Sequence, residues 1–293
     1  MTAAAGKAST RTDGSQAERM PGELEVLDRA SRENFSVASL VLGRDARAHL
    51  LAIYGFARLV DQLGDEAGGD RLAHLDDLED DLARAFDGEA EHPLLRRLAP
   101  TLKAFDLPRE PFQRLIEANR RDQSVVAYAT FDELLGYCEL SANPVGELVL
   151  HIFGAATPDR IALSDRVCTA LQLAEHWQDV AEDYRNGRVY LPAEDLRRFG
   201  VTTDDLAATL TGGPLRQLLG FEVARARELL DGGAGLVGRL RGRARIAVAG
   251  YVGGGRAALE AIAAADYDVL AGAPKAGSGR RVRATLRAFV TGS

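Results

Sequence analysis

The sequence predicts an all-α protein, and three observations point to this class. From about residue 22 onward, apolar residues recur at the three- and four-residue spacing of amphipathic helices. Alternating strand patterns are almost absent, and the one short candidate, Arg188–Pro192, is interpreted as an extended loop. No low-complexity linker interrupts residues 22–270. We therefore predict a disordered tail over residues 1–21 and a single all-α domain over residues 22–293.

The helical pattern divides into segments whose ends carry helix-breaking residues. Proline stands near several predicted starts, and Asp-Gly and Asn-Gly pairs stand near predicted ends. Pro144 and Gly146 interrupt an apolar helix and predict a kink in it. A flexible loop over residues 272–279 precedes a basic final helix. The other predicted helices cover residues 22–33, 44–66, 70–87, 92–105, 109–127, 131–154, 159–186, 214–247 and 251–270.

Composition excludes several classes of function. The chain of 293 residues is 46% hydrophobic and 27% charged, which is typical of a globular protein. Its net charge of −7 and the absence of a basic stripe argue against binding to nucleic acid. No apolar run is long enough to cross a membrane, and the N-terminus does not resemble a signal peptide. Cys138 and Cys168 form no CxxC motif, so we expect buried thiols in a cytoplasmic protein that at most rests on the inner membrane.

Two acidic motifs carry most of the functional information. Asp61 and Asp65 form the first acidic motif, and Asp179 and Asp183 form the second; in each, the aspartates are four residues apart within a helical pattern. At about 100° per residue, Tyr54 and Arg58 lie within about 60° of the first pair.

The same geometry places Gln172 on the stripe of the second motif, with Glu175 about 40° to one side of Asp179 and His176 about 60° to the other. For His176, simple packing beside Trp177 is the alternative to a functional role. The sequence leaves two interpretations of Asp122 open: it lies on the surface, or its carboxylate points inward.

A helix stripe that faces a core should be apolar, so four aspartates there require a cation. Mg²⁺ is the natural choice, because it binds carboxylate oxygens and bridges them to substrate phosphates. One such pair alone is weak evidence. The run at residues 76–81 has the same spacing beside a separate leucine stripe, and we interpret it as solvated surface.

At these residues the chain resembles the squalene/phytoene synthase family, over about residues 30–270. The resemblance implies an isoprenoid synthase fold, in which two acidic helices face a central cavity and hold Mg²⁺ around a prenyl diphosphate. It implies metal binding by Asp61, Asp65, Asp179 and Asp183. It also implies contacts to the diphosphate or substrate from Asn34, Phe35, Tyr54, Arg58, Gln172, Gln178 and Tyr190. The matching elements are Asn34-Phe35-Ser36, Tyr54-x3-Arg58-x2-Asp61-x3-Asp65, Asp122, Tyr137-Cys138 to Val145-Gly146, Gln172-x6-Asp179-x3-Asp183 and Gly187-Arg188-Val189-Tyr190.

The departures from the family pattern narrow the expected activity. Glu175 stands where the family usually has Asn, and Gln178 stands where it usually has Arg. The loss of a cation and the gain of a carboxylate suit one bound diphosphate better than two. The pattern is most similar to the hydroxysqualene synthases, the bacterial hopanoid-pathway branch of the family. These enzymes convert presqualene diphosphate to hydroxysqualene.

The resemblance therefore implies a Mg²⁺-dependent carbon–oxygen lyase, with Glu175 or His176 directing a water molecule to the carbocation. No GxGxxG fingerprint predicts a nicotinamide step, so a separate reductase would take the product. Transient contacts with a sister synthase, a reductase or a membrane surface are expected. Three alternatives stay open. The first is a prenyltransferase that condenses two prenyl diphosphates head to head, as a presqualene diphosphate, squalene or phytoene synthase does. The others are a terpene cyclase and a non-catalytic assembly factor of the same fold.

Overall fold

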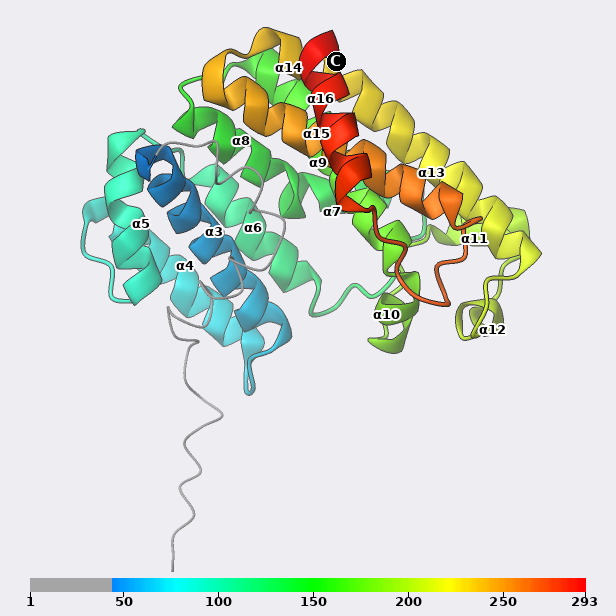
Figure 1. Cartoon of the computed structure of the whole chain (residues 1–293). Coiled ribbons are helices and arrows are strands. Elements are labelled where there is room, and N and C mark those ends of the chain that lie inside the picture. Colours follow the sequence, from blue (N-terminus) through cyan, green and yellow to red (C-terminus); the bar gives the residue numbers. More distant parts are fainter. Residues whose placement is uncertain (1–43) are drawn as a thin grey trace, which may run out of the picture.

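The computed structural model describes residues 44–293 and is all-α over that range, as predicted (Figure 1). In this part of the chain, the extended pairing consists of one isolated parallel bridge between Ala127 and Val189. The predictions for the N-terminal tail, for a helix over residues 22–33 and for Asn34 and Phe35 lie outside the described residues. None of the described helices is both long and apolar enough to cross a bilayer.

The order of helices follows the predicted pattern closely. The described helices are α3 (Arg44–Asp65), α4 (Arg71–Asp87), α5 (Pro93–Ala104), α6 (Glu110–Arg121), α7 (Phe131–Ser141), α8 (Asn143–Ile152), α9 (Pro158–Gln178), α10 (Val180–Arg185), α11 (Ala193–Phe199), α12 (Thr203–Leu206), α13 (Gly213–Ala234), α14 (Leu236–Arg239), α15 (Gly242–Ala264) and α16 (Ser278–Thr291).

The helices bury two adjoining hydrophobic cores. In the first, α3 packs against α4, α5 and α6, and Phe56 meets Phe112 edge to face at 5.1 Å between ring centroids. In the second, α9 runs through the middle and packs against α8, α13 and α15, with Trp177 fully buried (Figure 1). Helix α8 belongs to both, because Leu148 faces the first core and Leu150 the second. This shared helix fixes α3 relative to α9, the two helices that carry the acidic motifs.

Two predicted helices are each divided in two. The kink predicted at Pro144 is confirmed, because the chain breaks at Ala142 between α7 and α8. The prediction of one unbroken helix over residues 159–186 is wrong. Asp179 leaves helical geometry at φ −103°, ψ 15°, and its carbonyl accepts hydrogen bonds from the amides of Glu182 and Asp183 at 2.9 and 2.8 Å. The second acidic motif is therefore split between the end of α9 and the short α10.

Other boundaries also differ from the sequence pattern. The sequence pattern predicted a break near residue 249, between helices over residues 214–247 and 251–270. In the structure the chain between α13 and α15 instead breaks at Leu240, which is extended, just before Gly242 with φ +56°. The short helices α11 and α12 were not predicted.

The acidic run at residues 76–81 is only partly exposed to solvent. Asp81 is 4% exposed, and its carboxylate accepts hydrogen bonds from the backbone amides of Glu91 and His92, both at 2.8 Å. It therefore holds the loop between α4 and α5 in place. The basic final helix is confirmed as α16.

Candidate active site

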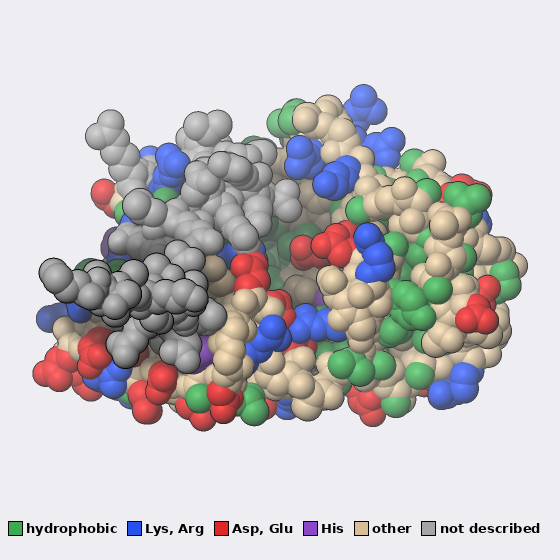
Figure 2. Space-filling model, turned by 90° about the horizontal axis from the view of Figure 1, so that it is seen from below, with side chains coloured by type: hydrophobic (Ala, Val, Ile, Leu, Met, Phe, Trp, Pro, Cys, Tyr) green, Lys and Arg blue, Asp and Glu red, His purple; other side chains and the backbone are tan. Residues whose placement is uncertain are grey.

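A polar cleft of about 300 Å³ lies where α3, α6, α7 and α9 meet the segment after α10. Figure 2 shows acidic side chains on both sides of a hollow in the face seen from below. The cleft is lined by Asp61, Asp65, Leu115, Asn119, Asp122, Tyr137, Ser141, Gln172, Glu175, His176, Arg188 and Tyr190. The sequence-predicted residues Asp61, Asp65, Gln172, Glu175, His176 and Tyr190 are thus brought together, although they are up to about 130 positions apart in the chain.

Helix α3 places the first acidic motif on one wall. Asp61 accepts a hydrogen bond from the Asn119 amide at 3.4 Å, and Arg58 approaches Asp61 at 3.8 Å. Gly64 permits this contact, because a Cβ there would stand 2.2 Å from Oδ1 of Asn119. Tyr54 and Arg58 share the helix face but are not among the lining residues of this cleft.

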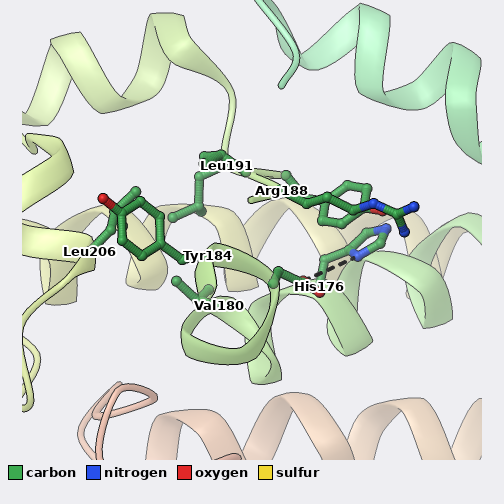
Figure 3. Close-up of a pocket in the computed structure, with 9 residues that line it drawn as sticks. His176, Val180, Tyr184, Arg188, Leu191 and Leu206 are labelled. Atoms are coloured by element: carbon green, nitrogen blue, oxygen red, sulfur yellow. Dashed lines mark ion pairs between the residues drawn. The ribbon is translucent and has the colours of Figure 1, made fainter. Parts of the chain in front are cut away.

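The end of α9 forms the opposite wall. Gln172 and His176 lie one turn apart, with their side-chain nitrogens 3.2 Å from each other. The other ring nitrogen of His176, Nδ1, is 3.9 Å from Asp183 on α10. Figure 3 shows this ion pair and a small adjoining hollow, where Val180, Tyr184 and Leu206 form an apolar group and His176 and Arg188 extend away from it.

Arg188 joins the two walls. One of its terminal nitrogens lies 2.7 Å from Oδ1 of Asp65, a residue 123 positions earlier in the chain. The backbone beside it is held in place, because the Val189 amide donates to the Val126 carbonyl at 2.8 Å. Arg188 stands in a motif that matches the family, but the sequence alone predicted no role for it. A cation directly after an acidic motif was the available signal.

Aromatic rings form the inner surface of the cleft. Tyr190 stacks on His176, with ring centroids 3.6 Å apart and an interplanar angle of 14°. Tyr137 lies 5.8 Å from Tyr190 and donates its hydroxyl to Asp122 at 2.8 Å. Asp122 therefore points inward, which decides between the two interpretations of this residue. Burial raises the pKa of Tyr190 to about 12, so its hydroxyl stays protonated and able to donate.

Among the described residues that line the cleft, carboxylates outnumber cationic side chains. Desolvation raises the pKa of Asp61 to about 6, although Arg58 and Asn119 oppose the shift. Desolvation also raises the pKa of Asp179 to about 6, and repulsion from Glu175 and Asp183 adds to the shift. Burial also raises the pKa of Asp122. Carboxylates with such raised pKa values are stabilised by an added cation.

The donor set fits Mg²⁺ that shares its coordination with a phosphorylated ligand. Oδ1 of Asp122 is buried and has no hydrogen-bond partner. Within residues 44–293, no three carboxylate, imidazole or thiol groups converge on a point where they could hold one ion. An ion here would therefore take one or two carboxylates together with ligand oxygens, which is the usual binding mode of Mg²⁺ in phosphate sites. Metal binding by the four aspartates stays a prediction.

Not every predicted residue faces the cleft. Asp179 stands at the break between α9 and α10, outside the lining of the cleft. Gln178 donates its side-chain amide to the carbonyl of Pro274 and so holds the loop before α16. Glu175 is exposed and lines the cleft. Of the two departures from the family pattern, only Glu175 reaches the cleft.

The helical fold and a cleft between two acidic walls define the class as an isoprenoid synthase. The family model described as "Squalene/phytoene synthase" matches residues 28–288. This chain belongs to the squalene/phytoene synthase family, as the sequence motifs predicted.

Individual relatives differ in their activities. The chain is 35% identical over 207 residues to the hydroxysqualene synthase of Zymomonas mobilis, covering 69% of each chain. It is 32% identical over 234 residues to the phytoene synthase of Mycobacterium tuberculosis, covering 78% of this chain and 77% of the relative. The crystal structure of squalene synthase HpnC from Alicyclobacillus acidocaldarius is similar with a TM-score of 0.78 and 47% identity, over 84% of this chain and 94% of that one.

Proposed function

We propose that this protein converts presqualene diphosphate and water into hydroxysqualene and diphosphate. The observation that carries the proposal is the position of Glu175. Its carboxylate lines the same cleft as Asp61 and Asp65, at a site where the family usually has an amide. A second diphosphate in this cleft would meet added negative charge, so the cleft suits a substrate with one diphosphate. The similarity to the hydroxysqualene synthase of Zymomonas mobilis supports this choice.

The reaction begins when the bond between the substrate carbon and the diphosphate oxygen breaks. The leaving diphosphate keeps the electron pair, and the guanidinium of Arg188 on the cleft wall stabilises its charge. Mg²⁺, when bound by the acidic motifs, supplies further stabilisation of that charge. Tyr190 and Tyr137 line the inner cleft, and their aromatic rings stabilise the carbocation left behind. The cation rearranges within these walls before water reaches it.

One water molecule completes the reaction. Its oxygen forms the new bond to the cationic carbon, and its proton passes to an acceptor on the protein. Glu175 is an exposed acceptor on the α9 wall of the cleft, and His176 lies buried one position further along. We propose that at least one of the pair orients this water. Simple packing is the alternative for His176, and its stacking on Tyr190 is compatible with either role.

Head-to-head condensation of two prenyl diphosphates is the second candidate. The similarity to a phytoene synthase favours it, and Arg58 and Arg188 offer two cations near the cleft. Since Gln178 is engaged by Pro274, the absence of an arginine at that position says less about diphosphate binding than the sequence alone indicated.

The deciding experiment supplies the purified protein with presqualene diphosphate or with farnesyl diphosphate, each with Mg²⁺, and identifies products by mass spectrometry. We expect hydroxysqualene from the first substrate and no efficient condensation of the second. Rapid formation of presqualene diphosphate or of a hydrocarbon from farnesyl diphosphate would favour the condensing alternative. If neither substrate releases diphosphate above the level of an Asp61→Asn variant, the protein is a non-catalytic relative.

A further inference from the structure

Helix α16 has two faces of different character. Its inner face packs on α15, where Gly253 lies so close to Thr285 that a Cβ on the glycine would stand 2.4 Å from the Thr285 amide. Ala288 is buried on the same side. The end of the helix is also tied down, because Arg245 donates to the Phe289 carbonyl at 2.7 Å and Gly238 donates to the Gly292 carbonyl at 3.0 Å. Because α16 is fixed against α15, its outer face points away from the rest of the protein (Figure 1).

That outer face is apolar. Val282, Leu286, Phe289 and Val290 are 55%, 59%, 37% and 77% exposed, and they are four of the seven large hydrophobic side chains exposed in the described part of the chain. At about 100° per residue they share one stripe about 100° wide. Scattered exposed hydrophobic residues are ordinary, but a stripe of four along one docked helix marks an interaction surface.

Arginines flank the stripe. Arg283 and Arg287 follow it around the helix, and Arg280 and Arg281 occupy the first turn; all four are exposed. Exposed Arg239, Arg241 and Arg243 stand at the neighbouring α14 and the start of α15, next to the end of α16. No Asp or Glu follows Asp268 in the sequence, and residues 236–293 contain ten Lys or Arg against three Asp or Glu. This concentration of positive charge in a chain of net charge −7 favours an anionic partner.

We propose that α16, together with the arginines of α14 and α15, docks the protein onto the surface of an anionic lipid membrane. An apolar stripe bordered by arginines is the arrangement of helices that lie in the membrane interface, because the side chains enter the acyl boundary while the guanidinium groups stay at the headgroups. Charge and apolar area act together: the arginines attract the anionic surface, and the stripe holds the helix there. The loop before α16 is held by Gln178 at the end of α9, the helix that forms one wall of the cleft. Docking would therefore also bring the cleft toward the phase that takes up a long, uncharged isoprenoid alcohol, a consequence that rests on the proposed function.

Vesicle flotation of the full-length protein, without substrate, tests the proposal independently of its activity. We expect the protein to float with vesicles of phosphatidylcholine and phosphatidylserine, to bind far less to phosphatidylcholine alone, and to lose binding as salt is raised. The combined R280Q, R281Q, R283Q and R287Q variant should bind about a thousandfold more weakly, at about 1 kcal/mol for each arginine. Leu286→Asp should also weaken binding, because it places a charge in the apolar stripe.

Matched controls use exposed residues elsewhere on the protein. Leu72 is 47% exposed on α4, so Leu72→Asp should bind vesicles as the unmodified protein does. The combined R47Q, R96Q, R166Q and R197Q variant removes the same charge from exposed positions outside the proposed surface. All variants should keep the circular dichroism spectrum and the rate of diphosphate release from detergent-dispersed substrate. The proposal is overturned if the protein does not bind anionic vesicles. It is equally overturned if the α16 arginine variant and the control arginine variant lose the same amount of binding. It is also overturned if Leu286→Asp instead abolishes a lipid-free dimer seen by sedimentation, since α16 would then serve a second copy of the chain.

Discussion

At the scale of single residues, the aspartates predicted to bind metal differ in how their charge is balanced. Asp65 meets the Arg188 guanidinium at 2.7 Å. Within residues 44–293, Asp61 lies beside the more distant Arg58 at 3.8 Å and accepts an amide hydrogen bond from Asn119. Asp179 lies among Glu175, Glu182 and Asp183, which all raise its pKa. An added cation would therefore stabilise the ionised forms of Asp61 and Asp179.

Replacing either residue should stop the reaction without unfolding the protein. Asp61→Asn or Asp179→Asn removes a carboxylate that would bind metal, and we expect the rate of diphosphate release to fall by about a hundredfold or more. Helical content, measured by circular dichroism, should be unchanged. Asp77→Asn, at an exposed position on α4, is the control and should retain full activity. Near-normal activity in both the Asp61→Asn and the Asp179→Asn variants would refute the metal assignment.

The raised pKa values predict an acidic limit to activity. With pKa values of about 6, Asp61 and Asp179 take up protons as the pH falls below 6, and a protonated carboxyl cannot bind metal. The rate at low Mg²⁺ concentration should therefore decline below pH 6. Raising the Mg²⁺ concentration should move this decline to lower pH, because metal and protons compete for the same oxygens. A rate that stays constant down to pH 5 at low Mg²⁺ would contradict the prediction.

The role of Glu175 and His176 is tested by product ratios. Glu175→Gln or His176→Phe should lower the yield of the hydroxylated product more than the release of diphosphate, because the carbocation forms but lacks a directed water. The missing alcohol should appear as eliminated or rearranged hydrocarbon in mass spectra, and ¹⁸O-labelled water should mark the oxygen of the normal product. If both variants keep the normal ratio of alcohol to diphosphate, the water is directed from elsewhere in the cleft.

At the scale of helices, two breaks position the site. The break at Ala142 lets α8 lie against α9, and the break at Asp179 turns α10 away from the α9 axis. Gly146 is central to the first arrangement. A Cβ on this residue would stand 2.4 Å from Oγ of Ser164 and 2.5 Å from Sγ of Cys168 on α9. The two helices can pack this closely only because residue 146 has no side chain.

Adding one methyl group at this contact should cost stability. Gly146→Ala overpacks the α8–α9 interface, and we expect it to lower the free energy of unfolding by about 1–3 kcal/mol. Gly136 on α7 has open space around its Cβ position, so Gly136→Ala should instead stabilise by about 0.4–1 kcal/mol. Urea unfolding followed by circular dichroism measures both. Equal effects of the two substitutions would show that the close approach at Gly146 relaxes freely.

At the scale of the whole molecule, the cleft lies between walls that belong to different parts of the fold. Asp61 is carried by α3, which belongs to the first core, and His176 by α9, which belongs to the second. Helix α8 and the extended segment bearing Arg188 connect the two. A ligand that contacts both walls should therefore stabilise the folded molecule as a unit.

Thermal unfolding tests this connection. Mg²⁺ together with inorganic diphosphate should raise Tm by about 5 °C or more at concentrations well above Kd, because the pair bridges both walls. Mg²⁺ alone or diphosphate alone should raise Tm much less, since neither balances the charge of the other. Chelation with EDTA should reverse the increase. A similar increase in the Asp61→Asn variant would show that the pair binds outside this cleft.

The sequence by itself determined the all-α class, most helix positions and the family, because helical periodicity and fixed motif spacing are local properties of the chain. It also identified Asp61, Asp65, Gln172, Glu175, His176 and Tyr190, which the structure brings to one cleft. The tertiary structure decided what depends on contacts between distant segments. The break at Asp179 and the inward turn of Asp122 toward Tyr137 follow from packing against other helices. Two further hydrogen bonds join residues about 100 positions apart or more: one from Arg188 to Asp65 and one from Gln178 to the Pro274 carbonyl. No local sequence pattern encodes such pairings.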